Sequence, residues 1–228
     1  MRVLSIVHSA EARTELFAQT TQAIDEWTFS GGGTPPDGYD AFMVFGGSMH
    51  PDQEHLHPWL GHEITWLREL VESGAPVLGV CLGAQLIARA FDSWVGPLPG
   101  GPEIGWPEVS LTRAGAADPV LGALPETFDA LEWHHYTYQL PPGAVSLAEN
   151  ERCNQAYRLG DACWAVQFHP EVTHAQVLGW IDDPEDPAPE REPLIEETAA
   201  KIARWNELGL ALCAAFLAAA ERSLARAA

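Results

Sequence analysis

Gly79-Val80-Cys81-Leu82-Gly83-Ala84-Gln85 is the stretch that decides the fold of this chain. The apolar run at 75–80 predicts a buried strand, and residues 84–91 have helical composition without proline. Cys81 therefore lies on a strand-to-helix turn, and Gly79 and Gly83 give it the G-x-nucleophile-x-G spacing of a sharp turn that exposes its side chain. The N-terminus of a helix favours thiolate over thiol. A buried structural cysteine is the alternative reading, because free cysteines are often buried.

The residues before this turn predict further elements of a parallel sheet. We expect strands at 1–8 and 39–45 and a helix at 58–72, which has apolar residues three or four positions apart. We also predict a surface helix over 10–27. This alternation of strands and helices along the chain implies right-handed crossovers and a doubly wound α/β sheet. The helix at 10–27 is predicted from the spacing of four apolar residues, Leu16, Phe17, Ile24 and Trp27.

The residues after the turn predict an antiparallel extension of the sheet. Segments 109–112 and 127–133 read as short strands with no long helix between them. Segments 155–159 and 163–168 predict a hairpin around Gly160-Asp161. The fold class is therefore α/β, with a mostly parallel sheet, helices on both of its faces and an antiparallel extension.

The C-terminal part differs in composition from the rest. Residues 180–192 are acidic and proline-rich, which predicts a solvated loop or linker. Residues 194–227 predict one long helix or two shorter ones, bent near Gly209. We expect one domain over 1–180, with the linker and helix of 181–228 packed on it.

Composition excludes several classes of function. The chain has 228 residues, 46% of them hydrophobic, which suffices for a sizeable core. Its formal charge of −20 opposes binding to nucleic acid, and no apolar run reaches the length of a membrane span. The scattered cysteines and the lack of a signal peptide predict a cytoplasmic protein. We expect no cofactor and no metal, since the segment with His50, His55, His57 and His62 contains two prolines and connects a strand to a helix, where polar residues are ordinary.

His169-Pro170-Glu171 is the second informative stretch. It ends the predicted strand at 163–168, because proline cannot continue a central strand. A carboxylate two residues from an imidazole can orient the ring and stabilise its charged form while the ring serves a nucleophile. Without the cysteine, a chance combination in a loop is the favoured interpretation of this motif.

Taken together, the two stretches closely resemble the class I glutamine amidotransferases, in particular the glutaminase domain of GMP synthetase and its free-standing relatives. The shared pattern is a strand, a Gly-Gly turn, a helix, the G-x-Cys-x-G-x-Gln turn, antiparallel strands and Gln-Phe-His-Pro-Glu, over about residues 1–177. The resemblance implies a flavodoxin-like class I glutaminase fold and cysteine-dependent hydrolysis of the glutamine side-chain amide through a γ-glutamyl thioester.

The resemblance also implies roles for individual residues. It makes Cys81 the nucleophile, His169 the base and Glu171 the residue that orients it. It implies that the N–H groups of Gly47 and Leu82 form the oxyanion hole. It also implies that the substrate is contacted by Gln85, His134 and Gly46. Each tetrahedral oxyanion requires donors that are already in place in a dry site.

Two departures from the family pattern bear on the substrate. Ser48 follows Gly46-Gly47 where relatives commonly have proline, and His134-His135-Tyr136 replaces His-Gly-Asp, which removes a carboxylate suited to an α-amino group. No nucleotide loop of a synthase domain appears, so ammonia would pass to a separate synthase subunit. The first hypothesis is a glutaminase, and the alternatives are a γ-glutamyl peptidase or hydrolase and a catalytically silent regulatory module.

Overall fold

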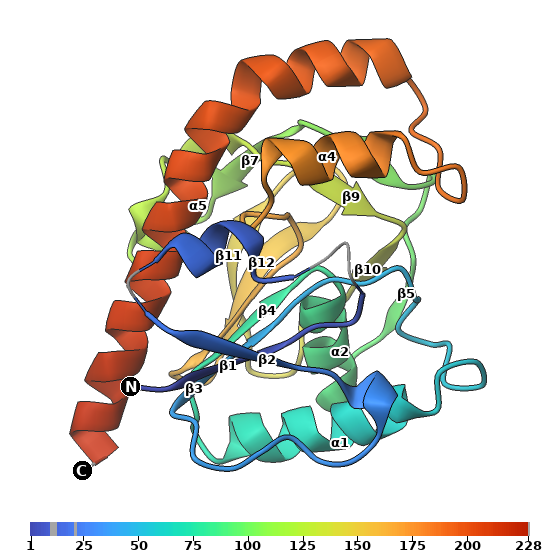
Figure 1. Cartoon of the computed structure of the whole chain (residues 1–228). Coiled ribbons are helices and arrows are strands. Elements are labelled where there is room, and N and C mark those ends of the chain that lie inside the picture. Colours follow the sequence, from blue (N-terminus) through green and yellow to red (C-terminus); the bar gives the residue numbers. More distant parts are fainter. Residues whose placement is uncertain (10–12, 21, 228) are drawn as a thin grey trace.

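The computed structural model of this chain describes residues 1–9, 13–20 and 22–227. Within these residues, nine strands form one sheet in the order β2-β1-β3-β4-β13-β12-β11-β7-β8 (Figure 1). The strands from β2 to β13 pair in parallel, and those from β13 to β8 pair antiparallel. The strands of this sheet are β1 (Val3–Ile6), β2 (Ile24–Trp27), β3 (Ala41–Val44), β4 (Val77–Val80), β7 (Glu108–Leu111), β8 (Thr127–Asp129), β11 (Val145–Glu149), β12 (Asn154–Leu159) and β13 (Cys163–Val166).

Two small antiparallel pairs and a set of helices complete the fold. β5 pairs with β10, and β6 pairs with β9. These strands are β5 (Val95–Pro97), β6 (Glu103–Gly105), β9 (Glu132–His134) and β10 (Tyr136–Tyr138). The helices are α1 (Trp59–Glu72), α2 (Leu82–Ala90), α3 (Arg113–Ala116), α4 (His174–Ile181) and α5 (Arg191–Ala227), with short 3-10 turns η1 (Glu15–Gln19), η2 (Phe29–Gly31) and η3 (Leu121–Ala123).

The two faces of the sheet build two separate hydrophobic cores. Successive side chains of a strand point to opposite faces, and the central strands are buried on both. Leu78 and Val80 of β4 belong to the core that contains the inner side of α5, whereas Val77 packs with α1 and α2. The mixed sheet with helices on both faces confirms the expected fold class.

Two of the predicted elements are wrong. The expected helix at 10–27 is the turn η1 followed by the strand β2, which pairs with β1, while residues 10–12 and 21 lie outside the described part. Ile24 and Trp27 therefore belong to an edge strand and not to a helical face. The expected strand at 127–133 is two strands, β8 and β9, which pair with different partners on either side of Ala130.

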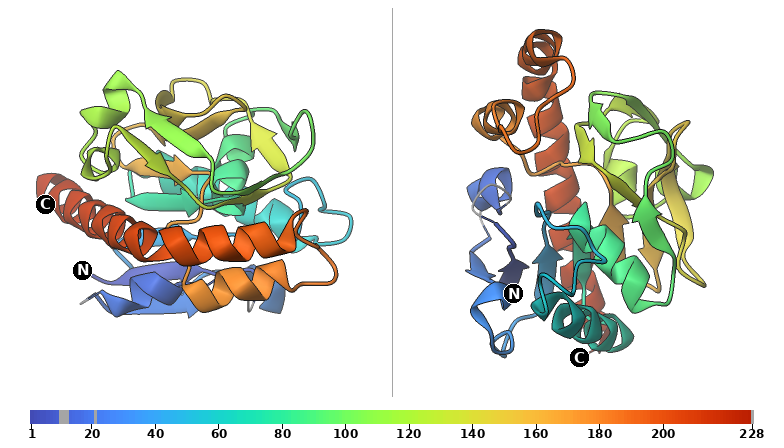
Figure 2. Two further views of the ribbon diagram at one scale, coloured as in Figure 1. Left: turned by 90° about the horizontal axis from the view of Figure 1, so that it is seen from above. Right: turned by 90° about the vertical axis from the view of Figure 1, so that its right-hand side faces the viewer.

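The C-terminal segment is one long helix, α5, without a break at Gly209, and Figure 1 shows that the helix changes direction after it passes α4. It runs beside α4 and along the sheet toward the N-terminus (Figures 1 and 2). A Cβ at Gly209 would lie 2.0 Å from the carbonyl oxygen of Pro170, so glycine here permits close packing. Among the described residues, α5 is the one helix long and apolar enough to cross a membrane. Buried core helices pass the same test, and Trp205, Leu212 and Phe216 of α5 lie in the core.

Candidate active site

Cys81 stands at the end of β4, on the tight turn into α2. Its backbone has φ 52° and ψ −107°, a conformation that costs a non-glycine residue free energy and is concentrated at functional sites. Both neighbouring glycines are required sterically. A Cβ at Gly83 would lie 2.1 Å from the oxygen of Val44, and one at Gly79 would lie 2.9 Å from the backbone of Gly83. The sequence pattern therefore produces the sharp turn that it predicted.

His169 and Glu171 meet on the turn after β13. The Nδ1 atom of His169 lies 2.8 Å from Oε1 of Glu171, and both side chains are buried. The backbone carbonyl of His169 accepts a hydrogen bond of 2.8 Å from the indole of Trp205 in α5. Trp180 of α4 packs its ring edgewise against the imidazole, with the centroids 4.9 Å apart. The histidine is therefore held from three sides.

Cys81 and His169 line the same cavity, and the Sγ of Cys81 lies 4.0 Å from the carbonyl oxygen of Trp133. Because Nδ1 faces Glu171, Nε2 is the nitrogen left for the sulfur. Burial lowers the pKa of His169, but the charges of Glu171 and Cys81 and the hydrogen bond to Glu171 raise it well above the usual histidine value. Such a ring readily holds a proton taken from the thiol. The arrangement can therefore perform nucleophilic catalysis with a cysteine, a base and an orienting carboxylate.

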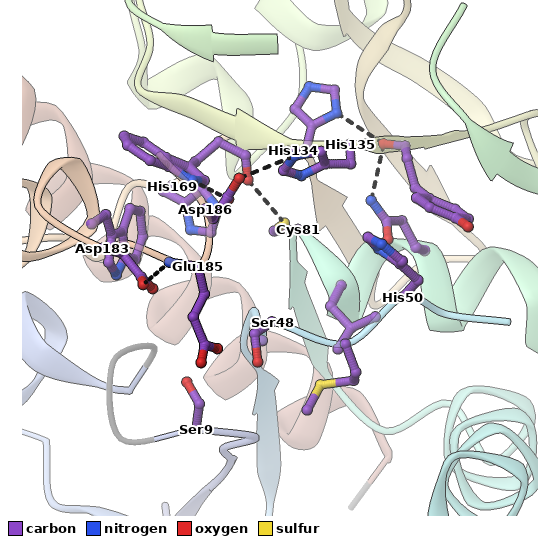
Figure 3. Close-up of a pocket in the computed structure, with 17 residues that line it drawn as sticks. Ser9, Ser48, His50, Cys81, His134, His135, His169, Asp183, Glu185 and Asp186 are labelled. Carbon is purple, nitrogen blue, oxygen red and sulfur yellow. Dashed lines mark hydrogen bonds and ion pairs between the residues drawn. The ribbon is translucent and has the colours of Figure 1, made fainter. Parts of the chain in front are cut away.

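A cavity of about 630 Å³ opens above Cys81 (Figure 3). Among the residues with assigned roles, Gly47, Leu82, Gln85, His134 and His169 line it, whereas Gly46 is not in the lining and directs its carbonyl to His8. Leu82 is the first residue of α2, and helices leave their first N–H groups unpaired. The cavity therefore places the Gly47 turn and the start of α2 beside the sulfur.

Gln85 and His134 line the cavity, but the amide nitrogen of Gln85 and the ring nitrogens of His134 form hydrogen bonds within the protein. The Nε2 of Gln85 donates to the carbonyl of Tyr136 and to Gln167. The Nε2 of His134 lies 3.0 Å from Glu103 and 3.3 Å from Glu132, and Nδ1 lies 2.8 Å from the oxygen of Tyr136. These contacts fix the wall made by residues 133–136.

The charges around His134 set its protonation state. Burial lowers its pKa, but the hydrogen bond to Glu103 and the charge of the nearby Glu132 raise it to about 10. Glu103, His134 and Cys153 bring possible metal-ligand atoms within 4.8 Å of one another. In this cluster Glu103 is already paired with His134 and Gln155, and burial raises the pKa of the Cys153 thiol to about 12. The cluster thus has the chemistry of a buried ion-pair network.

The loop between α4 and α5 supplies a wall of the cavity that the sequence did not predict. Asp183, Glu185 and Asp186 all line it (Figure 3). Asp186 accepts a hydrogen bond of 3.0 Å from the indole of Trp133 and lies 3.3 Å from Nε2 of His135. The acidic segment, expected to be a solvated loop, therefore reaches across the site. Composition alone could not reveal this, because the contacts that place Asp186 are with Trp133 and His135, about 50 residues earlier in the chain.

Comparisons with known proteins agree with this geometry. The family model of class I glutamine amidotransferases matches residues 4–177. The glutamine amidotransferase-like protein YfeJ of Salmonella typhimurium is 28% identical over 218 residues, which cover 90% of this chain and 91% of YfeJ. A glutamine-hydrolysing GMP synthase subunit from Haloarcula marismortui is 33% identical over 148 residues, covering 63% of this chain and 71% of that protein.

A solved structure shows the same similarity. The glutamine amidotransferase of Thermotoga maritima superposes with a TM-score of 0.84 at 25% identity, over 94% of this chain and 97% of that protein. The family as a whole is one of enzymes that act on the side-chain amide of glutamine. This chain belongs to the class I glutamine amidotransferase family.

Proposed function

We propose that this protein hydrolyses a γ-glutamyl amide, with glutamine as the first candidate substrate, through a thioester on Cys81. The sulfur gives its proton to His169 and attacks the amide carbon. The developing oxyanion accepts hydrogen bonds from the N–H groups of Gly47 and Leu82. Glu171 keeps the imidazole oriented and stabilises its charged form.

Two chemical steps complete the reaction. In the first, His169 returns its proton to the amide nitrogen, the carbon–nitrogen bond breaks, and ammonia leaves behind a γ-glutamyl thioester. In the second, His169 takes a proton from a water molecule, which attacks the thioester, and the carbon–sulfur bond breaks to release glutamate and restore the thiol. The related GMP synthase subunit from Haloarcula marismortui supports the further proposal that the ammonia passes to a separate synthase protein.

The observation that carries this proposal is that Cys81 and His169 line one cavity, while His169 forms a hydrogen bond of 2.8 Å with the buried Glu171 behind it. A glutamine-like electrophile tests it directly. We expect one covalent adduct per chain, mapped by mass spectrometry to Cys81, and no adduct on the Cys81→Ala variant. A protein that neither forms the adduct nor releases ammonia is instead a silent module of this fold.

The acidic wall favours a second candidate, a γ-glutamyl hydrolase whose leaving group is a cationic amine. Asp183, Glu185 and Asp186 follow α4, whose Trp180 touches His169, the proposed proton donor to the leaving nitrogen. Three carboxylates on that side attract positive charge and repel negative charge. They could hold the ammonium of a diamine leaving group.

A substrate panel separates the two candidates. It contains glutamine, a γ-glutamyl dipeptide, a γ-glutamyl diamine and the length-matched neutral amide. Higher kcat/KM for the diamine derivative than for its neutral match, reduced in Glu185→Gln, supports the second candidate. Turnover of glutamine above all three others supports the first.

A further inference from the structure

A buried histidine–glutamate pair lies directly behind the Gly46-Gly47 turn. His8 follows β1 by two residues, and Glu63 is on the inner side of α1. Both ring nitrogens of His8 are engaged: Nε2 lies 3.0 Å from each carboxylate oxygen of Glu63, and Nδ1 lies 3.0 Å from the oxygen of Phe45 and 3.1 Å from that of Gly46. Both side chains are fully buried. The thioester chemistry proposed above assigns no role to them.

The hydrogen bonds of His8 fit an imidazolium that faces an ionised Glu63. A neutral imidazole has one donor and one acceptor nitrogen, but the partners of His8 are carbonyl and carboxylate oxygens, which only accept. With Glu63 ionised, the ring therefore donates from both nitrogens. Burial lowers the pKa of His8, but the charge and hydrogen bond of Glu63 and the two carbonyls raise it above the usual value. The charged ring thus donates a hydrogen bond to the backbone carbonyl of Gly46 in the turn.

This contact controls the direction of the next N–H group. The carbonyl of Gly46 and the N–H of Gly47 belong to one planar trans peptide, so they point in opposite directions. A carbonyl held toward His8 turns the N–H of Gly47 away from His8. The packing at Gly47 is also tight, since a Cβ there would lie 2.8 Å from the Cβ of His8 and 3.2 Å from Leu82.

We propose that His8 and Glu63 are positioning residues that hold the Gly46–Gly47 peptide with the Gly47 N–H aimed at the oxyanion formed on Cys81. The inference rests on the proposed function for its catalytic meaning. It also explains how a turn with Ser48 in place of proline stays ordered, because the histidine restrains it from behind. Without this pair the peptide is free to rotate and to turn a carbonyl toward the oxyanion.

The decisive variant replaces both members of the pair, His8→Phe with Glu63→Leu. Removing one member alone would leave a buried charge, whereas replacing both by apolar groups of similar size commonly keeps the fold. We expect kcat to fall by about 10²-fold, the usual effect of losing one oxyanion donor, with KM nearly unchanged. Alkylation of Cys81 by iodoacetamide forms no oxyanion and should keep its wild-type rate. Glu72→Gln, an exposed change on the same helix, is the matched control.

The conservative variant Glu63→Gln gives a second readout. A glutamine amide can donate to Nε2, so a neutral His8 can still donate from Nδ1 to Gly46. In the wild type, deprotonation next to the carboxylate removes that donor, so its kcat should fall as pH rises through the raised pKa of His8. The ratio of Glu63→Gln to wild-type kcat should therefore increase with pH. Glu63 is the charged group facing His8, Trp59 stacks on its ring at 5.6 Å, and His57 lies beyond Trp59.

Each failure has a distinct meaning. A folded double variant with kcat within about threefold of wild type overturns the inference. If the double variant does not fold, a flat ratio for Glu63→Gln across the pH range overturns it. If the wild type hydrolyses no substrate in the panel, the proposed function fails, and a crystal structure of the double variant decides the positioning role. An unchanged Gly46–Gly47 peptide in that structure would refute it, and a rotated one would support it.

Discussion

Gly209→Ala in the long helix α5 should destabilise the protein, although the same change stabilises most helices. Glycine inside a helix costs about 0.8–1.0 kcal/mol relative to alanine, so propensity alone predicts a gain. The new Cβ, however, would lie 2.0 Å from the backbone oxygen of Pro170. Contact distances between such atoms are ordinarily well above 3 Å, so helix and turn must separate by about 1 Å or more. Overpacking of this kind costs about 1–3 kcal/mol, which exceeds the gain.

The displaced turn carries the two proposed catalytic partners of Cys81. Pro170 lies between His169 and Glu171, and misplacing reacting groups by about 1 Å can cost about 10²-fold in rate. Gly209→Ala should therefore lower both the melting temperature and kcat. A loss of 1 kcal/mol corresponds to about 2–4 °C in Tm for a protein of this size.

Thermal unfolding beside a matched substitution tests this reasoning. Gly61→Ala is the control, because Gly61 lies in α1 and a Cβ there meets nothing within 4 Å. Its Tm should rise or stay unchanged while that of Gly209→Ala falls. If Gly209→Ala raises Tm as much as the control does, the close approach of α5 to Pro170 is not a constraint on the fold.

Three further outcomes follow from the structure. Cys81→Ala and Cys81→Gly should both lose all hydrolysis, but the glycine variant should be more stable than the alanine variant by about 1 kcal/mol in urea unfolding, because φ at this position is 52°. Because folding raises the pKa of His134, its contribution to the free energy of unfolding should be complete below pH 6.5 and should be lost as the pH rises toward about 10. The variant His134→Gln should flatten that part of a plot of unfolding free energy against pH. Asp118→Ala should cost more than about 2 kcal/mol in chemical denaturation, and Asp118→Asn less, because Oδ1 accepts hydrogen bonds from the N–H groups of Val120 and Leu121 and the indole of Trp164.

The elements that the sequence predicted well are those whose signals are local. The turn at Cys81 was predictable because glycines on both sides of a cysteine between a strand and a helix leave few other conformations. The hairpin of β12 and β13 was predictable because the turn residues Gly160-Asp161 lie between two apolar runs. The start of α1 at Trp59 followed the proline before it.

The errors arose where the deciding interactions are distant in sequence. Ile24 and Trp27 have spacings that fit a helix, but pairing with β1 makes them a strand. The segment 182–190 is an exposed loop, as predicted, but the sequence does not show that contacts to Trp133 and His135 bring Asp186 over the site. Glu63 carries a partial signal, since it is a charged residue among the apolar positions of α1, but its partner His8 is 55 residues away.

The hydrogen bond from Trp205 to the carbonyl of His169 also constrains biosynthesis. The two residues are 36 positions apart, and the donor comes from the last helix of the fold. On the ribosome, a nascent chain can already pair β4 with β13 while α5 is still inside the exit tunnel. At that stage the backbone carbonyl of His169 lacks its hydrogen bond from the indole of Trp205. The surroundings of His169 are thus completed only when translation has passed α5, after the sheet itself is able to form.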